Sequence, residues 1–135
     1  MNIKLVCPYR EISGYGKISR TYYQSLLHTG YNIEIDDSFF KSIDERITLP
    51  KNNKKLKSID KTLYVIPPDR IPHVDKSYPI KLTMFETNLF PPHWVSELNQ
   101  NYREVIVPCQ YNVDGLKNSG DRKSTRLNSS HGKLS

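Results

Sequence analysis

Two glycines near the start of the chain are spaced as in a loop that binds phosphate. Gly14 and Gly16 lie in the stretch SGYGKISR, residues 13–20, between a short apolar run and a segment with helical periodicity. A glycine lets the backbone approach a ligand, and the first turn of a helix presents N–H groups and a positive dipole end to an anion. The pattern therefore predicts a phosphate site. A turn and a helix start without any ligand is the structural alternative.

The glycine pair also invites comparison with the fingerprint of dinucleotide-binding domains. Gly14-x-Gly16-x-x-Ser19 approximates that fingerprint. Asp36 follows at about the 20-residue spacing expected of a ribose-binding acid. The fingerprint needs its first glycine in the tight turn that leaves the first strand, whereas residues 7–13 separate that strand from Gly14 here. A dinucleotide-binding module therefore remains an alternative, as does a non-catalytic Rossmann-like binding module.

Two further motifs follow the glycine pair along the chain. The first reads MFETNxxPxxW over residues 84–94, and the second reads VPCQYN over residues 107–112. In order and spacing, the three motifs resemble the N-terminal domain of the family-four retaining glycosyltransferases, which have the GT-B fold. The resemblance covers residues 1–120. Cys109 and Gln110 stand where that family often has a small residue and a basic or polar one.

The resemblance implies part of an enzyme that transfers a sugar from a nucleotide-diphosphate donor to a sugar or lipid-linked acceptor. In that family the donor binds mostly in a C-terminal domain, so we expect no transferase activity from this chain by itself. The resemblance places Gly14, Tyr15, Gly16 and Arg20 at the donor phosphate. It implies no metal and no cofactor beside the nucleotide sugar, because protein groups and a helix dipole stabilise the leaving diphosphate.

Glu86 is the acidic residue that the same resemblance places near the cleft. It is the candidate catalytic residue, positioned to orient an acceptor hydroxyl or to contact the transferred sugar, with Thr87 and Asn88 as candidate cleft residues. A capping or loop carboxylate is the alternative for Glu86. An exposed helix arginine is likewise the alternative for Arg20. Trp94 is expected to pack a helix onto the sheet rather than to stack on a sugar.

Alternating strand and helix patterns must position these residues. Apolar runs predict strands at residues 3–6, 32–35, 61–66, 80–85 and 104–107. A periodic pattern predicts a helix over residues 16–27 that Gly30 ends, and further helices opened by Pro91 and Pro92 and begun at Tyr111. This alternation predicts an α/β fold, a Rossmann-like parallel sheet flanked by helices that forms the partial N-terminal half of a GT-B enzyme. Ligands of such sheets bind beyond the carboxyl ends of the strands.

The charge of the chain does not point to nucleic acid. The formal net charge is +6, but no basic stripe is interleaved with aromatic residues, so no nucleic-acid partner is expected. A polar segment carries a cluster of lysines: Lys51, Lys54, Lys55 and Lys57. This cluster is a candidate for peripheral contact with an anionic membrane, and a solvated loop is the alternative. The first apolar run is too short for a signal peptide, so we expect a cytoplasmic chain.

The last block, residues 121–135, differs from the rest of the chain. It is polar, lacks periodicity, and carries Arg122, Lys123, Arg126 and Lys133 against a single acid, Asp121. Residues 121–131 read DRKSTRLNSSH and resemble the translation of a common short-read sequencing adapter. We therefore interpret residues 121–135 as an artefactual, disordered tail and expect the natural protein to continue past Gly120. A natural basic tail is the alternative.

Overall fold

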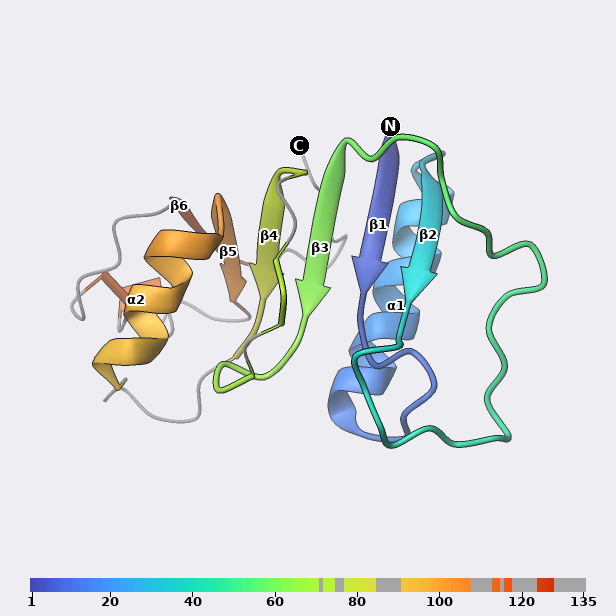
Figure 1. Ribbon diagram of the computed structural model, residues 1–135, viewed down its shortest axis with the longest axis horizontal. Coiled ribbons are helices and arrows are strands. Elements are labelled where there is room, and N and C mark those ends of the chain that lie inside the picture. The colour runs from blue at the N-terminus through green and yellow to red at the C-terminus, as the bar shows by residue number, and fades with distance from the viewer. Residues whose placement is uncertain are drawn as a thin grey trace.

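Short apolar runs form the strands of one parallel sheet. The computed structural model describes residues 1–70, 72–74, 77–84, 91–107, 113–114 and 116–117, and the backbone of 124–127. The strands are β1 (Asn2–Val6), β2 (Asn32–Asp36), β3 (Lys61–Val65), β4 (Pro79–Leu82), β5 (Glu104–Val107) and β6 (Ser124–Leu127). They lie in the order β2-β1-β3-β4-β5-β6, and each pairs in parallel with its neighbours (Figure 1). The predicted Rossmann-like α/β fold is confirmed.

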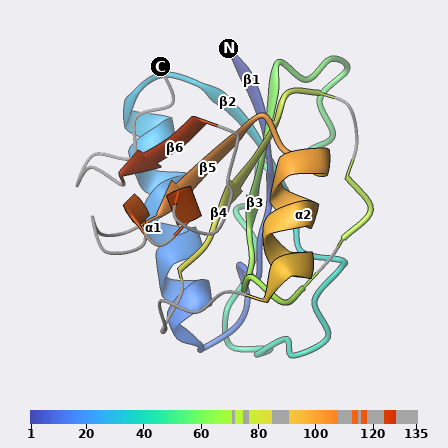
Figure 2. The same cartoon turned by 90° about the vertical axis from the view of Figure 1, so that its left-hand side faces the viewer.

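Two helices cover opposite faces of the sheet, as Figure 2 shows. Helix α1 (Gly14–His28) packs Tyr22, Tyr23 and Leu26 onto a core that includes Leu5 and Leu63. Helix α2 (Pro92–Asn101) packs onto a second core of buried residues: Val6, Tyr64, Ile66, Val105 and Val107 among others. Strands between the helices, such as β5, are therefore buried on both sides, which suits the apolar run of residues 105–107, whereas β1 and β2 carry Lys4 and Glu34 within the strand.

Helix α1 ends where the sequence predicted. Gly30 has φ +90°, a left-handed conformation that glycine adopts without strain. Its N–H bonds the carbonyl of Leu27 at 2.9 Å, and the N–H of Tyr31 bonds the carbonyl of Leu26 at 3.3 Å. This pair of bonds is a Schellman motif, which satisfies the last carbonyls of the helix and turns the chain into β2.

The order of the strands creates a switch point between β1 and β3. The chain leaves β1 through α1 to reach β2 on one side, then returns past β1 to place β3 on the other side. Loops that leave neighbouring strands in opposite directions open a crevice at the carboxyl ends, where open α/β sheets bind ligands. The chain that follows β1 carries the glycine pair, so the fold puts this motif at the crevice.

Residues 37–60 return the chain from β2 to β3 through turns and extended backbone. Part of this segment lies against the outer edge of β2. The Asn53 side chain accepts a bond from the Ile35 N–H at 2.8 Å and donates one to the Ile35 carbonyl at 3.1 Å. The Glu34 carboxylate accepts the Leu56 N–H at 2.8 Å. Side chains thus satisfy an edge that would otherwise offer its backbone to another strand.

Strand β6 falls within the block predicted to be a disordered tail. Its backbone pairs in parallel with β5, with Ser124 opposite Glu104 and Leu127 opposite Val107. Residues 121–123 and 128–135 lie outside the described residues. At residues 124–127 the structure therefore differs from the expected disorder, because the exposed edge of β5 offers these residues backbone partners. The proposed origin of the block stays a prediction.

Within the part of the chain that the structure describes, no helix is long and apolar enough to cross a membrane.

Candidate functional site

The candidate site begins at the first turn of α1, beyond the carboxyl end of β1. Ser13 caps the helix: its Oγ accepts the Gly16 N–H at 3.2 Å, and its carbonyl accepts the Lys17 N–H at 3.1 Å. The helix starts at Gly14, two positions before the predicted start, so both glycines belong to its first turn. No acidic residue lies in that turn. The positive end of the helix dipole therefore faces the crevice without a carboxylate of its own turn.

The two glycines serve different purposes in the structure. A Cβ at Gly16 would overlap the Glu11 carbonyl oxygen and lie 2.8 Å from the Glu11 carbonyl carbon. Gly16 is therefore required for the loop before α1 to pack on the helix. A Cβ at Gly14 would meet no described atom within 4 Å, and Gly14 does not have a left-handed backbone. Nothing in the described structure demands glycine at position 14.

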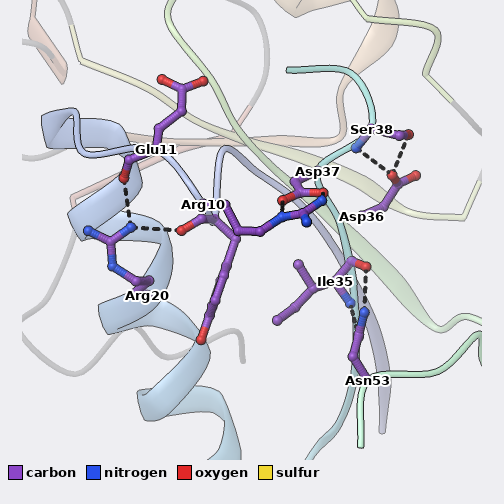
Figure 3. Close-up of polar contacts among 9 residues, drawn as sticks. Arg10, Glu11, Arg20, Ile35, Asp36, Asp37, Ser38 and Asn53 are labelled. Carbon is purple, nitrogen blue, oxygen red and sulfur yellow. Dashed lines mark hydrogen bonds and ion pairs between the residues drawn. The ribbon is translucent and has the colours of Figure 1, made fainter. Parts of the chain in front are cut away.

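Arg20 holds the same loop in place. Its Nη1 donates hydrogen bonds to the carbonyls of Tyr9 and Glu11, each at 2.7 Å (Figure 3). Charged donors of this kind form the stronger class of protein hydrogen bonds. The structure therefore gives Arg20 a role in shaping the chain between β1 and α1. Contact between Arg20 and a phosphate stays a prediction.

Tyr15 connects the glycine pair with the second sequence motif. Its hydroxyl lies 3.4 Å from the Thr83 Oγ1 and accepts the Met84 N–H at 3.3 Å. Thr83 and Met84 follow β4 directly, and the chain then runs on to Glu86. Two motifs about 70 positions apart in sequence are thus joined at the carboxyl edge of the sheet. Glu86, Thr87 and Asn88 themselves lie outside the described residues, so their placement stays untested.

The ion pair between Arg10 and Asp37, which no sequence pattern predicted, holds the loop between β1 and α1. The Arg10 guanidinium donates from Nε to Asp37 Oδ2 at 2.6 Å and from Nη2 to Asp37 Oδ1 at 2.9 Å (Figure 3). Asp37 is buried, and Arg10 is half-buried. The residues lie 27 positions apart, so no local spacing links them. The only signal was that Asp37 follows the second strand. The pair fixes the loop after β1 to the end of β2.

Asp36, the candidate ribose-binding acid, is also engaged with the protein. Its Oδ1 accepts both the Ser38 N–H at 3.0 Å and the Ser38 hydroxyl at 2.6 Å (Figure 3). The Lys4 Nζ lies 3.8 Å from the Asp36 Oδ2. Partial burial raises the pKa of Asp36, but the hydrogen bonds from Ser38 and the charge of Lys4 outweigh it, so the pKa is lowered.

The loop between β1 and α1 differs from that of a dinucleotide-binding domain. Residues 7–13 form a loop with two turns, unlike the single tight turn of a dinucleotide fingerprint.

Cys7, the first residue after β1, is a buried thiol. Burial raises its pKa to about 12, although a hydrogen bond involving Ser19 acts against the shift. A thiol with so high a pKa is neutral at physiological pH and is a poor nucleophile. Cys7 is therefore part of the core. Cys109 lies outside the described residues.

An open groove of about 770 Å³ lies beside the helix cap. One wall is Glu11, Ile12 and Ser13, and the other is formed by residues 42–46. The two walls are joined by a backbone bond from the Asp44 N–H to the Arg10 carbonyl at 2.7 Å. Polar groups alternate with the exposed side chains of Ile12 and Ile43. No local pattern predicted the second wall, because residues 37–60 lack periodicity.

Trp94 was predicted to pack a helix onto the sheet. Trp94 packs against the second core, beside α2, as predicted. Among the described residues, no group of three or more histidine, cysteine or carboxylate side chains is placed to hold a metal ion.

Comparison with protein-family models, with curated proteins and with solved structures gives no match for this chain.

Proposed function

We propose that this chain is part of a glycosyltransferase that uses a nucleotide-diphosphate sugar, and that the first turn of α1 receives the donor diphosphate. Three features support the proposal: the helix start lies at the switch point of the sheet, the loop before it is braced by Arg10 and Arg20, and the motif resemblance runs along the same residues. A braced loop supports catalysis because its dipoles need no reorganisation when charge develops on a leaving diphosphate.

Gly14 carries the proposal. Glycine costs conformational entropy on folding, and a side chain at position 14 would meet no described atom within 4 Å. A glycine without a structural reason, exposed at a helix start, is well explained by a ligand that needs the space a side chain would fill. Gly16, by contrast, is explained by its contact with Glu11 and says nothing about a ligand.

The charges around the helix start favour an anion. Lys17 lies in the first turn, and Arg20 lies one turn further along the helix. Glu11 opposes them, although its carboxylate accepts a bond from the Ser13 hydroxyl at 3.1 Å. Asp44 and Glu45 lie across the groove, where Asp44 is paired with Arg46 at 2.8 Å. The helix dipole and the cations at the helix start therefore favour a phosphate placed at the turn itself.

We place the acceptor in the groove beside the cap. Its carboxylates and hydroxyls suit the hydroxyl groups of a sugar, and the exposed Ile12 and Ile43 suit the apolar face of a sugar ring or a lipid. By resemblance, Glu86 orients the acceptor hydroxyl, with Thr87 and Asn88 beside it. The Tyr15 hydroxyl supports this arrangement because it ties the donor turn to the chain that leads to Glu86.

The decisive experiment is a titration of the isotopically labelled chain with uridine diphosphate and with pyrophosphate, followed by NMR. We expect the backbone amides of Gly14, Tyr15 and Gly16 to shift, with affinities in the millimolar range because the donor site is only partly present. Gly14→Ala should weaken binding about tenfold, or about 1.4 kcal/mol, without loss of stability. Gln24→Ala, an exposed change on the same helix, is the matched control. Binding that is unaffected by Gly14→Ala, or shifts confined to other regions, would refute the proposal.

Transfer itself needs the donor domain. We expect the chain to show no sugar transfer from any nucleotide sugar. Under the proposal, a chain that also carries a C-terminal donor domain is expected to show transfer, whereas a gene that stops directly after the Gly120 codon would favour a non-catalytic binding module.

A further inference from the structure

A second concave site lies at the other end of the sheet. Its volume is about 310 Å³, and it is more enclosed than the groove beside the helix cap. It is lined by residues from α1, from the start of β2 and from the loop along the outer edge of β2, which come together at the amino ends of the strands (Figure 1). The volume is at the lower end of the range for sites that bind small molecules, roughly 300–1,000 Å³.

The floor of this amino-end pocket is formed by largely apolar side chains, although polar groups contribute the larger share of the pocket's exposed surface. Tyr23 and Leu27 come from α1, Ile33 comes from β2, and Leu56 comes from the edge loop. Leu27 remains 39% exposed, which is unusual for a leucine that lies beside a core. The floor therefore keeps apolar surface accessible that a ligand of matching shape would remove from water.

The rim of the pocket is polar and carries one charge. Asn52 lies in the turn that the Asn53 N–H closes on the Pro50 carbonyl, and Lys54 follows that turn. The Asn53 side chain between them bonds the backbone of Ile35 (Figure 3). Among the described residues, neither Asn52 nor Lys54 has a hydrogen bond or an ion pair that holds its side chain. None of the described residues that line the pocket is acidic. An ammonium and an amide are therefore available to the same ligand group.

We propose that the amino-end pocket binds a small amphipathic anion, with an aryl or short acyl group on the apolar floor and a carboxylate at Lys54 and Asn52. The apolar floor selects against a simple inorganic anion, and the single ammonium selects against a neutral or cationic ligand. This site is separate from the donor site, because it lies at the amino ends of the strands and the first turn of α1 lies at the carboxyl ends.

The test uses 3-phenylpropionate as the probe, with 3-phenylpropanol and acetate as partial probes, in NMR titrations of the labelled chain. We expect phenylpropionate to shift the amides of Leu27, Ile33 and Leu56, and each partial probe to bind about tenfold more weakly. Lys54→Gln should weaken phenylpropionate binding about tenfold. Lys57→Gln, an exposed lysine of the same loop that does not line the pocket, is the matched control and should change binding less than twofold.

Equal effects of the two lysine variants would overturn the proposal, because net charge rather than the pocket would then explain binding. So would equal binding of phenylpropanol, or the absence of shifts at the three floor residues. Sedimentation of the chain with phosphatidylglycerol vesicles, without any phenylpropionate binding, would also overturn it. That outcome would assign the lysines to a membrane surface and leave the pocket without a ligand.

Discussion

Replacing Gly16 by alanine tests the claim that this glycine is required by packing. The new methyl group would overlap the Glu11 carbonyl oxygen, which also accepts a hydrogen bond from Arg20 at 2.7 Å. Carbon and oxygen atoms that are not bonded rarely approach closer than about 3.3 Å. The loop before α1 must therefore move away from the helix, and the bond from Arg20 to Glu11 must lengthen or break.

The size of the effect follows from these two losses. Overpacking of this kind costs about 1–3 kcal/mol. Loss of a hydrogen bond to a charged donor costs about 1.5–3 kcal/mol. Alanine in place of glycine in a helix returns about 0.5–1 kcal/mol. We therefore expect Gly16→Ala to lower the free energy of unfolding by about 2–5 kcal/mol, a large share of the stability of a typical domain.

Urea unfolding followed by circular dichroism measures this change. Gly14→Ala is the matched control: it adds the same methyl group two positions earlier, where no described atom lies within 4 Å. The control should change stability by less than about 0.5 kcal/mol. Arg20→Ala combined with Gly16→Ala should cost less than the sum of the two single changes, because both disturb the same loop. Equal stability of the Gly14 and Gly16 variants, or additive effects of Gly16 and Arg20, would refute the reasoning.

Three further predictions concern groups away from the helix start. The Lys81 Nζ lies 2.8 Å from the Glu97 carboxylate, and both side chains are buried. Lys81→Met leaves that carboxylate without its cation, so we expect the free energy of unfolding, measured in urea, to fall by about 3–5 kcal/mol. Adding Glu97→Leu should recover part of this loss. In a Cys109→Ser variant, iodoacetamide at pH 8 should modify Cys7 far more slowly in the folded chain than in urea. Because the folded pKa of Cys7 is raised from 9.0 to about 12, its contribution to stability is complete below pH 9 and is lost as pH rises toward 12, which alkaline unfolding curves will detect. Asn53→Ala removes two bonds to an edge strand, and sedimentation velocity should then show self-association that the unmodified chain lacks.

Much of the fold follows from local sequence patterns. Apolar runs such as residues 104–107 predicted a strand with the bounds that the structure has, since a strand buried on both faces needs little else. Gly30 predicted the end of α1, because a left-handed residue is needed there. Residues 124–127 lack a periodic pattern, and their pairing depends on a neighbouring strand, so no local pattern predicted it.

The candidate site was predicted only in outline. The glycine pair and its place after the first strand are local features, so the sequence revealed them. The bonds of Arg10 to Asp37 and of Tyr15 to Thr83 join residues 27 and 68 positions apart, and such contacts depend on how the whole sheet is assembled. The distinction between Gly14 and Gly16 was equally hidden, because it depends on where the Glu11 carbonyl lies.

The hydroxyl of Tyr15 links the first turn of α1 to the residues that follow β4. If the turn moves toward an incoming phosphate, the N–H of Met84 loses its acceptor or follows the tyrosine ring. Met84 lies two residues before Glu86 in the sequence. If the proposed function is right, a displacement of the first turn on binding of the donor would therefore reach the chain that leads to the proposed acceptor residue. The Tyr15 hydroxyl is thus a single contact through which a ligand at the helix start would change the position of the backbone after β4.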